Sequence, residues 1–278
     1  MVEESLIQKR YVAVDKSDTI SHLIGQLKQN KAKAALVFDK NKFIGIADTH
    51  LLIKTKLDPT SMKVDKIVKK IPVLNGKEEL GEVARLLLTS DTRMLPVIDH
   101  EKVIGVINSL DVIKQLHNTE AGKKKLKEVM TLSPITIHEN DRLGKAIEIM
   151  KENHVSRIPI VNDKGELVQI AALTDLLYDY TLRLQSRSDA RGKGMLSQHG
   201  PRTSRAYGDK TELNAYPIKN ISTLIIITAS PDDTIGRTID KMERFDISSI
   251  VVVEGKRPVG IIATRDLLKL LLKHQVTY

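Results

Sequence analysis

The heptapeptide GVINSLD at residues 105–111 has two counterparts in this chain, QIAALTD at residues 169–175 and GIIATRD at residues 260–266. In each of them a run of apolar residues leads into an aspartate, around which an apolar helical pattern begins. A fourth stretch, GIADTHL at residues 45–51, has the same apolar run but carries leucine at the aspartate position. Recurrence of one pattern along a chain is the signature of internal repeats, so the sequence predicts four of them.

A helix is predicted in front of each heptapeptide. Positions i, i+3, i+4 and i+7 are apolar, with one threonine among them, which indicates that one face of each helix is buried. The four sets are Ile20, Leu23, Ile24 and Leu27; Leu80, Val83, Ala84 and Leu87; Leu143, Ala146, Ile147 and Met150; and Ile235, Thr238, Ile239 and Met242. Acidic or hydroxyl residues precede three of the helices, and we expect them to cap the free backbone amides. They are Ser17 and Asp18, Asn140 and Asp141, and Asp232 and Asp233.

Two short apolar strands joined by a polar turn follow each predicted helix. The turns fall at residues 39–42, 99–102, 162–166 and 254–258 and are rich in residues that reverse a chain. The repeating unit is therefore strand, helix, strand, strand, helix, which predicts an α+β fold. The spacing of the repeats is nearly constant except in the last interval, which is longer because of a basic insertion at about residues 183–216.

Composition limits the class of protein. The chain has 278 residues, of which 41% are hydrophobic, so it can bury one or two cores. No stretch approaches the roughly 18 apolar residues that a membrane-spanning helix needs, and the first residues lack the apolar run of a signal peptide. Since the chain has no cysteine, it has no disulfides and no thiolate metal sites. We expect a globular cytoplasmic protein without a membrane partner.

The three heptapeptides that end in aspartate resemble the signature of the CBS (cystathionine beta-synthase) domain, which is glycine, two apolar residues, threonine or serine, two free positions and aspartate. SPITI at residues 133–137 and RIPIV at residues 157–161 resemble further parts of that domain. Four tandem copies are similar to the gamma subunit of AMP-activated protein kinase and its archaeal stand-alone relatives. The resemblance implies one module of repeats 1 and 2 at residues 10–120 and another of repeats 3 and 4 at residues 121–278, paired into a flattened disk.

The same resemblance implies a non-catalytic regulatory sensor. Its ligands would be adenosine-containing molecules, either AMP, ADP and ATP or S-adenosylmethionine, bound in clefts between paired repeats. It would need no cofactor, would act on a separate protein partner, and could pair with a second copy of itself.

The aspartates suit such a ligand on chemical grounds. A carboxylate at the start of a helix is held by free amides and by the helix dipole, and it can accept hydrogen bonds from both hydroxyls of a ribose. Asp111, Asp175 and Asp266 are therefore candidate ribose-binding residues, whereas Leu51 leaves repeat 1 without one. At most three such sites are expected. The alternative is that each aspartate only caps its helix.

Further candidate residues follow from the resemblance. The site of Asp266 is expected to include repeat 3, where Arg157 would bind a phosphate and the base would lie near Thr131, Ile135 and Val155. Three residues stand where the family has threonine or serine: Asn108, Ala172 and Ala263. The predicted ligand-binding set is completed by Asn108, Ser156, Thr174, Thr264 and Arg265.

No catalytic or metal-binding motif is found. The eight histidines are scattered, without a spacing typical of zinc ligands, so we expect neither a metal site nor an enzyme. The net charge of +9 leaves a second hypothesis open, because a basic protein attracts nucleic acid. In that case the basic insertion would bind nucleic acid and the repeats would be its scaffold.

Overall fold

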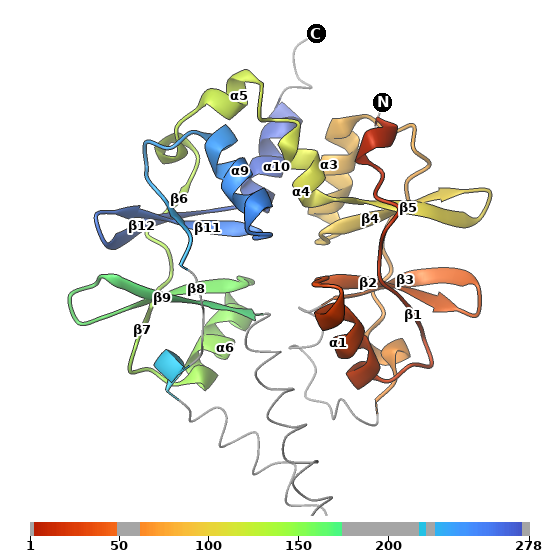
Figure 1. Ribbon diagram of the computed structural model, residues 1–278, viewed down its shortest axis with the longest axis horizontal. Coiled ribbons are helices and arrows are strands. Elements are labelled where there is room, and N and C mark those ends of the chain that lie inside the picture. The colour runs from red at the N-terminus through yellow and green to blue at the C-terminus, as the bar shows by residue number, and fades with distance from the viewer. Residues whose placement is uncertain (1–2, 49–61, 174–216, 221–225, 274–278) are drawn as a thin grey trace, which may run out of the picture. The chain divides into compact units, whose positions relative to one another are not determined.

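The computed structural model describes residues 3–48, 62–173, 217–220 and 226–273 (Figure 1). Leu51, Thr174, Asp175 and the basic insertion lie outside these ranges. One compact unit holds repeats 1 and 2, the start of repeat 3 as far as Ser133 and most of repeat 4, and a second holds residues 134–226 with the turn at residues 255–258. In the described part of the chain, no helix has the length and hydrophobicity that crossing a membrane requires.

Each repeat is built around a hairpin with a helix in front of it, as predicted, and the fold is α+β. Repeat 1 follows η1 (Glu4–Leu6) and consists of β1 (Ala13–Asp15), α1 (Ile20–Gln29), β2 (Ala34–Asp39) and β3 (Lys42–Asp48). Repeat 2 consists of η2 (Val64–Ile67), α3 (Leu80–Thr89), β4 (Met94–Asp99), β5 (Lys102–Asn108) and α4 (Ser109–Lys114). In each hairpin the strands are antiparallel, and β1 lies parallel to β2.

Repeats 3 and 4 repeat this plan. After α5 (Glu120–Lys123), repeat 3 consists of η3 (Leu126–Glu128), β6 (Thr131–Leu132), β7 (Ile137–His138), α6 (Leu143–Glu152), β8 (Arg157–Val161) and β9 (Leu167–Ala172). Repeat 4 consists of η4 (Ile218–Asn220), β10 (Thr228–Ala229), α9 (Ile235–Arg244), β11 (Ser249–Glu254), β12 (Arg257–Ala263) and α10 (Thr264–Lys273). The sheet of repeat 4 has the strand order β10-β11-β12-β6, so it includes a strand from the start of repeat 3.

The predicted apolar faces of the helices are confirmed. All four residues of the set on α1 are buried, and so are the four on α9, including Thr238. On α3 and α6 three of the four predicted residues are buried, and the fourth, Leu80 or Ile147, is half-buried. The period of 3.6 residues was therefore a sufficient guide to the buried side of each helix.

The predicted capping residues are wrong by one position. Thr19 and Thr234 cap α1 and α9, because their hydroxyls accept the N–H groups of His22 and Arg237. The aspartates in front of the helices instead accept the N–H of the residue three positions earlier, in the bonds Asp15 to Asp18, His138 to Asp141 and Ser230 to Asp233. These carboxylates close the turn between strand and helix, which leaves the next residue to cap. Helices α3 and α6 have no side-chain cap.

The segment that leads into each repeat folds against a neighbouring repeat. Gln8 exchanges two backbone hydrogen bonds of 2.8 and 2.9 Å with Val106 of repeat 2, and Lys69 exchanges two of the same lengths with Ile46 of repeat 1. Strand β6, ahead of repeat 3, pairs with β12 of repeat 4. The N–H of Ile218, ahead of repeat 4, donates to the carbonyl of Asp141 in repeat 3 at 2.9 Å. We call these stretches the leading segments, and they are exchanged between repeats 1 and 2 and between repeats 3 and 4.

Two glycines of the heptapeptides, Gly105 and Gly260, lie where a leading segment crosses. A Cβ at Gly105 would lie 2.8 Å from the carbonyl oxygen of Gln8, and one at Gly260 would lie 2.5 Å from the sulfur of Met130. At Gly105 the neighbour is backbone, so the leading segment could not pass as closely over any other residue, whereas at Gly260 the neighbour is the end of the flexible Met130 side chain, which can move aside.

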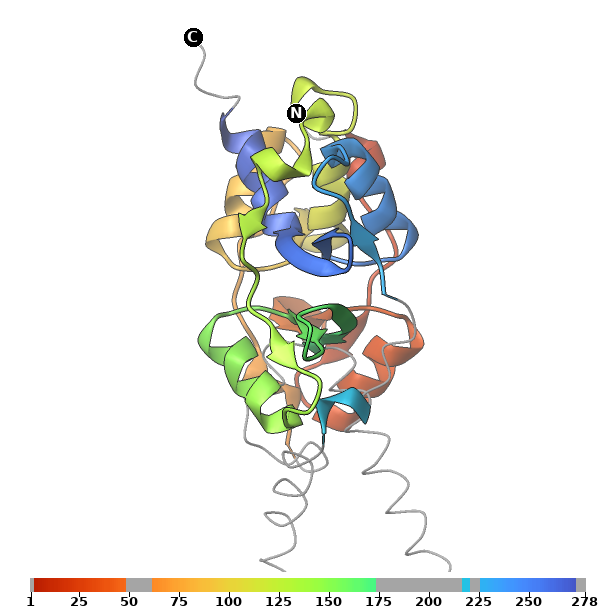
Figure 2. The same cartoon turned by 90° about the vertical axis from the view of Figure 1, so that its left-hand side faces the viewer.

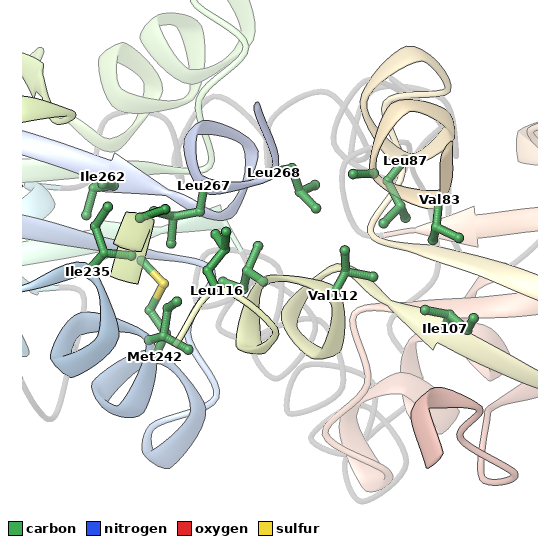
Figure 3. Packing of buried hydrophobic residues seen from close by; sticks show 14 of the residues in the cluster. Val83, Leu87, Ile107, Val112, Leu116, Ile235, Met242, Ile262, Leu267 and Leu268 are labelled. Atoms are coloured by element: carbon green, nitrogen blue, oxygen red, sulfur yellow. The ribbon is translucent and has the colours of Figure 1, made fainter. Parts of the chain in front are cut away.

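Repeats 2 and 4 share one hydrophobic core. Helices α3 and α4 pack against α9 and α10 (Figures 1 and 2). Val112 and Leu116 from repeat 2 belong to the same cluster of buried side chains as Ile235, Met242 and Leu267 from repeat 4 (Figure 3). The two repeats are therefore stabilised by the same burial of apolar surface.

Candidate ligand-binding sites

Asp266 is the third residue of α10, at the end of β12. One of its carboxylate oxygens accepts the N–H of Ala263 at 3.0 Å, and the other lies 3.4 Å from Nζ of Lys269. The side chain is 23% exposed. The bond to Ala263 joins the carboxylate to the residue just before the helix, as in one half of a capping box, and it fixes the carboxylate at the end of the sheet.

The structure brings one predicted residue of repeat 3 to this sheet. Thr131 on β6 pairs with Ile261 on β12, and Leu132 pairs with Gly260. Both β6 residues are exposed. Thr131 therefore lies on the strand beside β12, and β12 leads directly into α10 and Asp266.

Thr264 and Arg265 already have partners inside the protein. Thr264 is buried, and both its N–H and its hydroxyl donate to the carbonyl of Ser248 at 2.9 Å. The guanidinium of Arg265 forms an ion pair with Asp91 of repeat 2. Within this unit, Thr264 holds α10 on its own hairpin, and Arg265 connects α10 to repeat 2.

The other predicted residues of repeat 3 lie in the second compact unit. Ile135 is 42% exposed, and Val155, Ser156 and Arg157 are half-buried at the start of β8. The carbonyl of Ser156 accepts the N–H of Leu173 at 2.9 Å, the counterpart of the bond from Thr264 to Ser248. Because Asp266 belongs to the first unit, its association with these four residues stays a prediction.

Asp111 is the counterpart of Asp266 in repeat 2 and has a different neighbour. The side-chain amide of Asn108 donates to one carboxylate oxygen at 3.2 Å, and Nζ of Lys114 lies 3.7 Å from the other. Lys114 also forms an ion pair with Glu243 on α9. The Asp111 side chain is 14% exposed, so it is less accessible than that of Asp266.

A charged cluster, formed by Lys33, Asp48, Asp91, Arg93 and Asp246, lies where repeats 1, 2 and 4 meet. Nζ of Lys33 donates to the carbonyl of Asp246 at 2.6 Å and to its carboxylate at 2.8 Å. Burial lowers the pKa of the Arg93 guanidinium, while the carboxylates of Asp48, Asp246 and Asp91 act against that shift. The cluster joins residues that are far apart in sequence, and no motif pointed to it.

Metal binding has no support in the described ranges. There, no group of three or more histidine, aspartate or glutamate side chains is arranged to hold a metal ion.

Comparison with protein families gives one match. The model of the CBS domain matches residues 64–118, 126–180 and 218–273, which together make up more than half of the chain. These stretches are repeats 2, 3 and 4. Repeat 1, whose described part has the same helix and hairpin but which carries leucine at the aspartate position, is not among the matched residues.

Relatives of similar organisation come from archaea. Uncharacterized protein MJ1404 of Methanocaldococcus jannaschii is 24% identical over 273 residues, which are 96% of this chain and 61% of that protein. The crystal structure of protein MJ1225 from the same organism, proposed as an archaeal homologue of γ-AMPK, has a TM-score of 0.78 at 21% identity and covers 97% of this chain and 99% of its own. The structure of an uncharacterized conserved protein from Pyrococcus horikoshii has a TM-score of 0.62 at 22% identity and covers 98% of this chain and 100% of its own.

The fold is therefore shared with proteins of this size. The chain spans roughly half to three-fifths of the length of the curated relatives it matches first.

Proposed function

The chain belongs to the CBS-domain family, and from that premise we propose that it is a regulatory protein that binds an adenosine-containing ligand. The ligand is AMP, ADP, ATP or S-adenosylmethionine, and its main site is that of Asp266. The observation that carries the proposal is the Asp266 carboxylate, which is anchored by the N–H of Ala263 at the end of β12, the strand that pairs with Thr131 at Ile261.

The proposed site uses simple chemistry. A fixed carboxylate accepts the two hydroxyls of a ribose, because each oxygen has a lone pair to spare beyond the bond that anchors it. Thr131 provides a hydroxyl on the neighbouring strand, and Ile135 and Val155 provide apolar surface for the base. Arg157 supplies the fork of N–H donors that a phosphate needs.

Binding at this site would reach repeats 1 and 2 through charged contacts. Arg265, next to Asp266 in the first turn of α10, forms an ion pair with Asp91 of repeat 2. Lys33 of repeat 1 is bonded to Asp246 of repeat 4. A ligand that shifts the first turn of α10 acts on the first of these contacts directly, and the charged cluster links it to the second. We propose that this is how occupancy is passed on to a protein partner.

We expect adenosine-containing ligands to bind and to raise the melting temperature of the protein. At a ligand concentration 100 times the Kd, the gain is about 2.7 kcal/mol of stability. The measurement is calorimetry and thermal shift with AMP, ADP, ATP and S-adenosylmethionine, beside short RNA and DNA at two salt concentrations. The basic net charge of +9 favours nucleic acid as the second candidate. Binding of RNA or DNA that falls steeply with salt, without binding of any adenosine compound, would contradict the proposal.

Arg157 is expected to distinguish phosphate from nucleoside. Arg157→Ala removes the proposed phosphate contact, so it should weaken AMP binding by roughly 10- to 100-fold and leave adenosine binding unchanged. Titration calorimetry with both ligands measures the two effects. Lys151→Ala, which removes one exposed positive charge from α6 of the same repeat, is the control and should change neither. Equal weakening of AMP and adenosine by Arg157→Ala would assign Arg157 another role.

A further inference from the structure

We infer that Asn108 occupies the Asp111 carboxylate and thereby directs the ligand to Asp266. The inference rests on the function proposed above and adds a selection between two sites. The amide of Asn108 donates to Asp111 at 3.2 Å, so this side chain takes up one acceptor position and lies beside the carboxylate, where a ribose would have to compete with it. Asn108 is then a competitor of the ligand rather than one of its contacts.

The two helix starts follow the same plan around the aspartate. Asn108 directly precedes α4 as Ala263 directly precedes α10, and each lies three residues before its aspartate. Each aspartate also has a lysine three residues later, Lys114 or Lys269, near its other oxygen. The hydrogen-bond partner of the aspartate differs because the residue before the helix has an amide side chain in repeat 2, Asn108, and a methyl group in repeat 4, Ala263.

The methyl group of Ala263 makes no hydrogen bond, so the partner of the Asp266 carboxylate at this position is the backbone N–H of Ala263. In repeat 4 the oxygen nearest the sheet is held by the main-chain N–H of Ala263. That bond positions the carboxylate and needs no side chain to move. In repeat 2 the partner is the side chain of Asn108, and the Asp111 side chain is 14% exposed against 23% for Asp266. A hydrogen bond to a charged acceptor is stronger than one between neutral groups, so its loss opposes binding.

Asn108 makes no capping bond that would explain its presence. Its side chain accepts no hydrogen bond from the backbone of α4, although asparagine is among the best capping residues. The amide is therefore not needed to start the helix, and its replacement should leave the fold intact.

A reciprocal exchange of the two residues tests the inference. In an Asp266→Ala background, which removes the main site, we expect Asn108→Ala to raise the affinity for AMP by about tenfold, since one charge-assisted bond no longer competes. Adding Asp111→Ala should abolish that gain. In the wild-type background, Ala263→Asn should weaken AMP binding by about tenfold. Titration calorimetry with AMP measures the wild type and all four variants, and circular dichroism checks that each is folded.

The outcomes separate this inference from the proposed function. Suppose that the wild type binds AMP and that this binding depends on Asp266. If the Asp266→Ala protein then binds AMP equally well with and without Asn108→Ala, the role of Asn108 is overturned and the proposed function stands. A gain that survives Asp111→Ala would also overturn the role of Asn108. Absence of AMP binding from the wild type and from every variant would overturn the proposed function, and the selection with it.

Discussion

Alanine in place of Asp266 is expected to weaken AMP binding by roughly 10- to 100-fold, because a ribose loses the charged acceptor of its hydroxyls. Adenosine should lose affinity by the same factor, since the ribose is common to both ligands. This pattern differs from that of Arg157→Ala, which affects AMP only. Titration of the whole chain with both ligands measures it.

A different result is expected if Asp266 acts only as a helix cap and does not bind ligand. If the carboxylate only stabilises the start of α10, Asp266→Ala lowers the melting temperature and leaves ligand affinity unchanged. Asp233→Ala is the matched control, because Asp233 accepts the N–H of Ser230 at 3.0 Å, as Asp266 accepts that of Ala263 at 3.0 Å. We expect Asp233→Ala to reduce stability by about 1.5–3 kcal/mol, because hydrogen bonds to a charged group are lost, and to spare AMP binding.

Leu116→Ala is expected to lower the free energy of unfolding by about 2–5 kcal/mol. Leu116 is 1% exposed and belongs to the cluster shared by repeats 2 and 4 (Figure 3). Truncation to alanine therefore loses buried apolar surface and leaves a cavity in a core that serves two repeats at once. Urea unfolding, followed by circular dichroism, gives the change from the shift of the midpoint.

Two variants control for this effect. Leu116→Met keeps most of the volume and should cost less than about 1.5 kcal/mol. Ile104→Ala removes a side chain that is 45% exposed on β5 and should change stability by no more than about 0.5 kcal/mol. A loss from Leu116→Ala as small as that from Ile104→Ala would show that the core of repeats 2 and 4 is not a common source of stability.

Local elements could be predicted because their signals are local. Helix α9 is amphipathic within its own ten residues, so the buried set of Ile235, Thr238, Ile239 and Met242 follows from spacing alone. The capping prediction failed because two polar residues stand side by side. Asp18 and Thr19 can each accept from a backbone N–H, and only the path of the preceding strand decides that Asp18 bonds to Asp15 and Thr19 to His22.

The contacts between repeats could not be predicted in this way. Arg265 and Asp91 are 174 residues apart, and Lys33 and Asp246 are 213 apart, so no sequence period connects them. The candidate aspartates were identified from a short motif, but the motif did not show that Asn108 would bond to one of them. Geometry at the start of two equivalent helices was needed to distinguish Asp111 from Asp266.

The exchange of leading segments limits how such a chain can change over generations. Because the segment ahead of a repeat folds on its neighbour, a gene duplication or deletion that moves a single repeat separates a hairpin from the segment that crosses it. Repeats 1 and 2 together, or repeats 3 and 4 together, carry both halves of an exchange, so each of these pairs can be copied, lost or fused to another gene as one piece. The heritable unit of this architecture is consequently the pair.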